Sequence, residues 1–147
     1  AERAAEAELV LHAGDISGAP ALEWLAALGP PLCAVRGNVD EPGVAARLPE
    51  RLAVELRGVV VGLVHDAGPA HGRLERLRGW FPAAAAVVFG HSHVPLHEVA
   101  QDGFQIFNPG SATTRRREPR CTIGLATAGD GRIAFRHLEV PCSARAG

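Results

Sequence analysis

Apolar residues in this chain gather in short runs, most of which end at Gly or Pro. Three of these runs, at residues 9–13, 32–35 and 84–89, predict buried strands. Other runs face each other across short turns and predict three hairpins. These hairpins pair 52–56 with 59–64, 96–100 with 104–107, and 122–127 with 133–138.

Helix-like segments alternate with these strands, at residues 1–8, 21–28 and 69–81. A mixture of strand–helix units and hairpins indicates an α/β fold. Because so many hairpins must bury one face each, we expect two mixed β-sheets packed face to face with flanking helices. The 147 residues are 47% hydrophobic, which is enough for one core, and we predict a single domain over residues 1–147.

Charge and apolar length exclude several partners. The formal net charge is −1, so the chain has no overall basic field for nucleic acid. No apolar run approaches the roughly 20 residues that span a bilayer. We therefore expect no membrane partner, and nucleic acid only as a phosphodiester substrate; self-association is left open.

Cysteine and methionine usage adds two expectations. Cys33, Cys121 and Cys142 are odd in number and show no CxxC spacing, so we expect reduced thiols, no disulfide framework and a cytoplasmic location. The sequence contains no Met, which leads us to expect that an N-terminal piece is absent.

Four short segments that follow apolar runs carry candidate chemistry. They are Gly14-Asp15, Gly37-Asn38-Val39-Asp40, Val64-His65-Asp66 and Gly90-His91-Ser92-His93. Strand ends of layered α/β folds meet at one sheet edge, where ligands bind. Carboxylate, amide and imidazole groups together form an O/N ligand set that suits a two-metal hydrolytic centre. An extended His91-Ser92-His93 would also place both rings on one side of the chain.

In this order, and together with Asn108-Pro109-Gly110-Ser111, these motifs closely resemble the calcineurin-like metallophosphoesterases. The resemblance covers about residues 8 to 140 and is strongest to the small single-domain prokaryotic phosphodiesterases, the branch that also contains a retromer subunit. It implies two divalent metal ions, chosen among Mn, Fe, Ni, Zn and Co with Mn favoured. The Asn108 segment closes a tight turn near the metal cleft, with substrate contact as the alternative.

Matching positions assign the ligands that the resemblance implies. Asp15 would bridge the two metals, Asn38, His65 and His91 would complete the second site, and His93 would belong to the first. Asp40 is expected to be a turn or cap residue only.

Two departures from the family pattern change the expectation. Relatives carry an Asp-x-His motif on an opening strand, and this sequence lacks it, because His12 has no Asp two residues before it. We therefore expect that the first strand, with two ligands of the first metal, is missing and that the chain alone is inactive or impaired. Relatives also carry His-Gly-His where this chain reads His65-Asp66; we favour His65 as the ligand and keep His71 as the alternative.

The resemblance implies a divalent-metal-dependent hydrolase. This hydrolase would be a phosphoesterase, more narrowly a phosphodiesterase, in which a metal-bridging hydroxide attacks a small phosphate ester. The alternative is a non-catalytic protein-interaction scaffold on the same fold.

Overall fold

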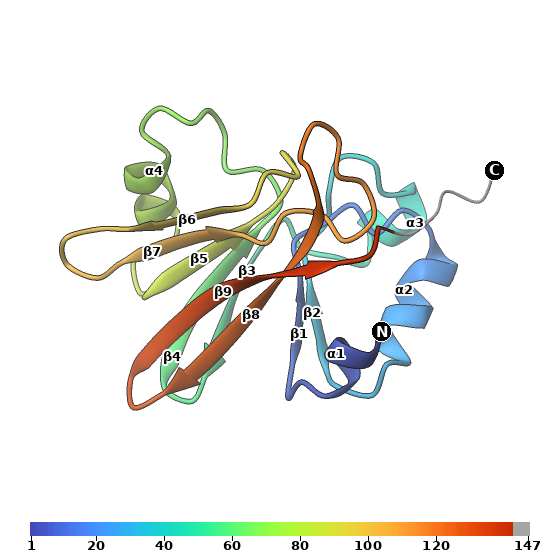
Figure 1. Ribbon diagram of the computed structural model, residues 1–147, viewed down its shortest axis with the longest axis horizontal. Helices are drawn as coiled ribbons and strands as arrows, with labels where there is room; N and C mark the ends of the chain where they lie inside the picture. Colours follow the sequence, from blue (N-terminus) through green and yellow to red (C-terminus); the bar gives the residue numbers. More distant parts are fainter. Residues whose placement is uncertain (143–147) are drawn as a thin grey trace.

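The structure, a computed structural model, describes residues 1–142. Short helices and strands alternate along this part of the chain. In order they are α1 (Glu2–Ala5), β1 (Val10–His12), α2 (Ala19–Ala26), β2 (Leu32–Ala34), α3 (Pro42–Ala45), β3 (Arg51–Leu56), β4 (Val59–Val64), α4 (Arg73–Trp80), β5 (Ala86–Phe89), β6 (Leu96–Val99), β7 (Gln105–Asn108), β8 (Cys121–Gly129) and β9 (Arg132–Val140) (Figure 1).

A five-stranded mixed sheet forms the centre, in the order β3-β4-β5-β7-β6. Strands β4, β5 and β7 run parallel, while the hairpin partners β3 and β6 add antiparallel edges. The residues of β5 are buried throughout. This is the pattern of a strand whose two faces are both covered.

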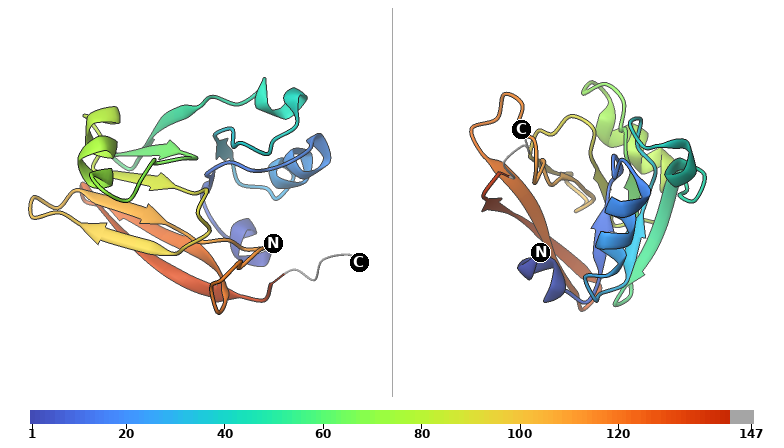
Figure 2. Two further views of the ribbon diagram at one scale, coloured as in Figure 1. Left: turned by 90° about the horizontal axis from the view of Figure 1, so that it is seen from above. Right: turned by 90° about the vertical axis from the view of Figure 1, so that its right-hand side faces the viewer.

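Alternate side chains of the central strands pack into two separate cores. Val61 and Leu63 join a cluster that includes Ile133 of β9 and, at its border, Leu11 of β1. Side chains on the opposite face pack against α4, whose Leu77 is fully buried. In the left view of Figure 2, α4 lies on one side of the central strands and the β8–β9 hairpin on the other.

The layer that faces the central sheet is divided. Strands β1 and β2 form a parallel pair, and β8 and β9 form a long antiparallel hairpin; each is a separate two-stranded sheet in the described residues. The expected sandwich of sheets with outer helices is confirmed, and the three predicted hairpins are β3–β4, β6–β7 and β8–β9. Helix α3 was not predicted, since four residues are too few to show a helical period.

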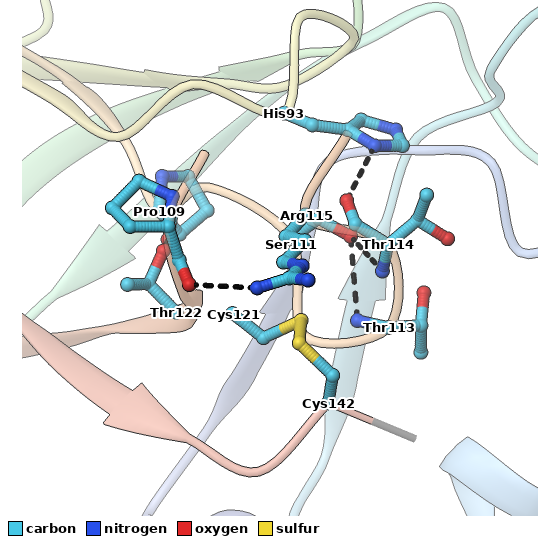
Figure 3. The surroundings of a disulfide bond; sticks show 10 residues. His93, Pro109, Ser111, Thr113, Thr114, Arg115, Cys121, Thr122 and Cys142 are labelled. Atoms are coloured by element: carbon cyan, nitrogen blue, oxygen red, sulfur yellow. Dashed lines mark hydrogen bonds between the residues drawn. A yellow bond between two sulfur atoms is a disulfide. The ribbon is translucent and has the colours of Figure 1, made fainter. Parts of the chain in front are cut away.

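The prediction of reduced cysteines is wrong for two of the three. Cys121 and Cys142 form a disulfide, with Cα atoms 5.3 Å apart (Figure 3). Cys33 is a free thiol. The hairpin register explains the pairing, because Cys121 lies opposite Val140 and Cys142 follows two residues later. The number and spacing of the cysteines along the sequence do not reveal this register.

Among residues 1–142, no helix combines the length and the apolar character that a membrane crossing requires.

Candidate metal centre

Four strand ends supply the candidate ligands. Asp15 and Asn38 follow the parallel strands β1 and β2 of the divided layer, and His65 and His91 follow the parallel strands β4 and β5 of the central sheet. Parallel strands end at the same edge, so each sheet delivers two side chains to one end of the sandwich. The site therefore lies where the two layers meet.

Side-chain atoms of these four residues converge within hydrogen-bond distance. The Oδ1 atom of Asn38 lies 2.8 Å from His65 Nε2 and 3.1 Å from His91 Nδ1, and the two ring nitrogens are 3.2 Å apart. Asp15 Oδ2 lies 3.4 Å from His65 Nε2. His65 is buried and Asp15 and His91 are half-buried, so the cluster opens toward solvent on the Asn38 side.

The tautomer of His65 determines what this cluster can hold. Its Nδ1 donates to the carbonyl oxygen of Ala13, 2.7 Å away, so in the neutral form of the ring the lone pair of Nε2 is aimed at Asn38 and Asp15. Oxygen and nitrogen lone pairs at these distances repel unless a proton or a cation lies among them. Carboxylate, amide oxygen and imidazole together form a ligand set that fits a divalent transition metal ion.

His93 lies outside this cluster. Its Nδ1 donates to the carbonyl oxygen of Thr114 at 3.0 Å, within the loop that precedes β8 (Figure 3). The expectation of an extended His91-Ser92-His93 is wrong, because φ is +67° at His91 and +62° at His93. Left-handed backbone at residues other than Gly is uncommon and turns the two rings in different directions.

The alternative ligand His71 is exposed and is not in the described cluster, whereas His65 is. His12 lies inside β1, where its buried Nδ1 has no hydrogen-bond partner. Burial lowers the pKa of His12, and the nearby carboxylates of Asp40 and Asp15 oppose this only in part. His12 is therefore neutral near pH 7.

Asp40 has a larger role than the expected cap. Its two carboxylate oxygens accept the backbone N–H groups of Ser17, at 2.7 Å, and of Gly37, at 2.6 Å. These groups belong to the loops that follow β1 and β2, so one carboxylate joins the loop of Asp15 to the loop of Asn38. The only sequence signal was the position of Asp40 at the end of a strand-end motif.

Close backbone approach requires Gly at position 37. A Cβ there would lie 2.1 Å from Asp15 Oδ1 and 2.2 Å from the backbone nitrogen of Asp15. Asp15 itself has φ of +60°, and its Oδ1 accepts the N–H of Val39 at 3.1 Å. The carboxylate is thus held between two loops that touch.

Asn108 was expected to close a turn or to contact substrate. Asn108 is fully buried at the end of β7, which excludes contact between its side chain and a substrate in this structure. The side chain does close the expected turn, since its Oδ1 accepts the Gly110 N–H at 2.9 Å. It also donates to Gly90 and Ser92 of the neighbouring strand-end turn.

Comparison with known proteins gives a consistent result. The model of the calcineurin-like phosphoesterase superfamily domain matches residues 1–131. A curated protein of Methanothermobacter thermautotrophicus, named "Probable metallophosphoesterase", is 34% identical over 113 residues, which cover 76% of this chain. The match spans 64% of the length of that relative.

Solved structures resemble the fold as a whole. Vps29 from Entamoeba histolytica, described in complex with zinc, superposes with a TM-score of 0.70 and 21% identity, covering 94% of this chain and 86% of that one. A structure described as a novel archaeal phosphodiesterase gives a TM-score of 0.72 at 19% identity, covering 90% and 83%. At this identity the two structures bear on the fold alone.

Proposed function

The chain belongs to the calcineurin-like phosphoesterase superfamily, and we propose that the full-length protein acts as a divalent-metal-dependent phosphodiesterase on a small phosphate ester. The observation that carries the proposal is the convergence of Asn38, His65 and His91 with the carboxylate of Asp15 at distances of 2.8 to 3.4 Å. The choice of a diester rests on the order of the strand-end motifs, which resembles that of the small prokaryotic phosphodiesterases.

Each residue has a proposed role. Asn38, His65 and His91 would hold one metal ion with Asp15, and Asp15 would also reach a second ion, to which His93 contributes. The hydrogen bond from His93 Nδ1 to Thr114 supports this role, because it leaves Nε2 of a neutral ring free to act as a ligand. Mn is the favoured ion for this mixed oxygen and nitrogen set.

Two divalent ions in such a centre supply Lewis acidity and make bound water a nucleophile at neutral pH. The residues of the chain prepare the site for this chemistry. The Ala13 carbonyl fixes the tautomer of His65, and the Val39 N–H orients the Asp15 carboxylate. Asp40 keeps the loops of Asp15 and Asn38 together, so the ligand geometry is set before a substrate arrives.

A non-catalytic scaffold is the second candidate. The feature that discriminates the two candidates is the Asp-x-His motif of the first metal, which the 147 residues do not contain. The ground for this candidate is the resemblance of the motifs to the branch of the family that also contains a retromer subunit. The two candidates differ in whether metal binding leads to turnover.

Hydrolysis of a chromogenic phosphodiester and of a phosphomonoester by the full-length protein would test the proposal. We expect Mn²⁺-dependent hydrolysis of the diester that chelator abolishes, and a loss of at least about 100-fold in His91→Ala. His71→Ala is the matched control, since this exposed histidine lies outside the cluster. Metal binding without hydrolysis of either ester would contradict the phosphodiesterase and favour the scaffold.

A further inference from the structure

The turn that carries His91 and His93 is held from the neighbouring strand by a buried amide. We propose that Asn108 is a positioning residue of the metal centre, which acts by fixing this turn and thereby the ring of His91. The inference rests on the proposed function in taking His91 as a ligand. It assigns a role to a residue that touches neither metal nor substrate.

Both side-chain N–H groups of Asn108 donate hydrogen bonds to this one turn. Its Nδ2 donates to the carbonyl oxygen of Gly90 at 3.0 Å and to Ser92 Oγ at 3.1 Å. Its Oδ1 accepts the N–H of Gly110 at 2.9 Å. An amide has two N–H donors, so its donating capacity is fully used on the residues that flank His91.

The backbone of the turn needs such support. His91 and His93 both have left-handed φ values, and the N–H of Ser92 folds back onto the Gly90 carbonyl at 2.8 Å. Strained conformations persist only where the surroundings determine them. On the side away from Asn108, the N–H of Gly90 donates to the carbonyl oxygen of His65 at 3.0 Å. The turn is therefore hydrogen-bonded both to the residue that follows β4 and to the last residue of β7.

Asn108 is itself fixed by the opposite layer. The ring of His137 in β9 donates through Nε2 to the Asn108 carbonyl oxygen at 2.7 Å, and the same ring stacks on Phe107 with centroids 4.4 Å apart. The position of the amide is therefore set by both sheets. A rigid support of this kind is what a ligand-bearing turn requires.

Truncation of two side-chain amides in the same strand separates positioning from general stability. Asn108→Ala removes the two bonds to the turn. Gln105→Ala is the matched control, because the amide of Gln105 also donates to a backbone carbonyl, that of Ile133 at 2.8 Å, but away from the turn. Ser92→Ala is a milder variant for the Asn108 contact. It loses the bonds that Ser92 Oγ accepts from Asn108 Nδ2 and from the Val94 N–H, and it keeps the bond from Asn108 to Gly90.

The measurements are Co²⁺ affinity by calorimetry, the visible absorption of the Co²⁺ protein at saturation, and amide hydrogen exchange of Ser92 in chelator. We expect Asn108→Ala to bind Co²⁺ about 10 to 100-fold more weakly, to change the absorption bands even at saturation, and to exchange the Ser92 amide faster. Ser92→Ala should show a smaller change of the same kind. Gln105→Ala should match the wild type in all three.

Failure of this inference differs from failure of the proposed function. Wild-type protein that binds no divalent ion would contradict the metal centre, while the exchange of Ser92 would still decide the positioning role. Wild-type affinity and spectrum in Asn108→Ala would overturn the inference. Equal effects of Asn108→Ala and Gln105→Ala would overturn it as well, and if Asn108→Ala does not fold, Ser92→Ala decides by the same comparison.

Discussion

Replacement of Gly37 by Ala tests the contact between the two loops of the divided layer. The added Cβ would lie 2.1 Å from Asp15 Oδ1 and 2.2 Å from the Asp15 backbone nitrogen. Carbon does not approach a nitrogen or oxygen atom closer than about 3 Å, so the loops must separate by about 1 Å. One of the obstructing atoms belongs to the backbone, which means that rotation of a side chain cannot relieve the clash.

The size of this displacement sets the expected effect. Overpacking of this kind costs about 1 to 3 kcal/mol of unfolding free energy. Metal ligands tolerate about 0.2 Å, so a shift of about 1 Å removes the Asp15 carboxylate from the centre. We therefore expect Mn²⁺ affinity in Gly37→Ala to fall by about 100-fold or more.

Gly43→Ala is the matched control for this experiment. Gly43 lies in α3, and a Cβ there meets nothing within 4 Å. This variant should bind Mn²⁺ as the wild type does and gain up to about 1 kcal/mol, because Ala favours the helix. Urea unfolding in chelator and calorimetric titration with Mn²⁺ measure both quantities. If Gly37→Ala and Gly43→Ala behave alike, the account of the loop contact is wrong.

Contacts outside the ligands lead to three further predictions. Cys142→Ser should lower the free energy of unfolding by about 3 kcal/mol, since its disulfide to Cys121 closes a separation of 21 residues; thermal unfolding of the wild type with and without a dithiol reductant should give the same difference. His12→Leu should flatten the pH dependence of stability. Burial lowers the pKa of His12 in the folded protein below 6.5, so the unfolded chain takes up this proton at a higher pH than the folded protein does. The stability of the wild type therefore falls as the pH drops below about 6.5. Urea unfolding of both proteins in chelator at about pH 7.5 and about pH 5.5 measures this slope, and equal slopes would contradict it. Asp40→Asn replaces one of the two oxygens that accept backbone N–H groups by an amide donor. The variant should lose about 1.5 kcal/mol of unfolding free energy in urea and bind Mn²⁺ about 10-fold more weakly in calorimetry. Unchanged values would show that the two loops do not depend on the Asp40 carboxylate.

The fold was predictable where the sequence repeats a local signal. Apolar runs that end at Gly14, Gly37 and Gly90 mark strand ends, and the paired runs mark all three hairpins of the described residues. What escaped prediction depends on register between strands. The disulfide of Cys121 required knowledge of which residue of β9 lies opposite it.

The candidate site was predictable as a set of residue types but not as a geometry. Strand ends indicated that Asp15, Asn38, His65 and His91 would meet. The left-handed turn at His91 could not be read from local preference, because its hydrogen bonds come from Asn108, 17 residues away along the chain. Long-range contacts determine such a turn, whereas a sequence pattern reports only its neighbours.

The strained backbone and the crowded acceptors have a common consequence for stability. Asp15, His91 and His93 adopt left-handed φ values, each at a cost of about 1 to 2 kcal/mol for a residue other than Gly. The lone pairs of Asn38, His65 and Asp15 also repel one another when no positive charge lies between them. A divalent ion removes the repulsion without changing the backbone.

Stability of the protein should therefore rise when a divalent ion is present, because the ion binds the folded arrangement of these ligands and not the unfolded chain. At a free ion concentration about 100 times the Kd, the expected gain is about 2.7 kcal/mol of unfolding free energy. Thermal unfolding in Mn²⁺ and in chelator measures this gain, and Asn38→Ala should lose most of it, because that variant removes the oxygen that both ring nitrogens face. An equal gain in wild type and Asn38→Ala would place the ion elsewhere and would separate the strained loops from metal binding.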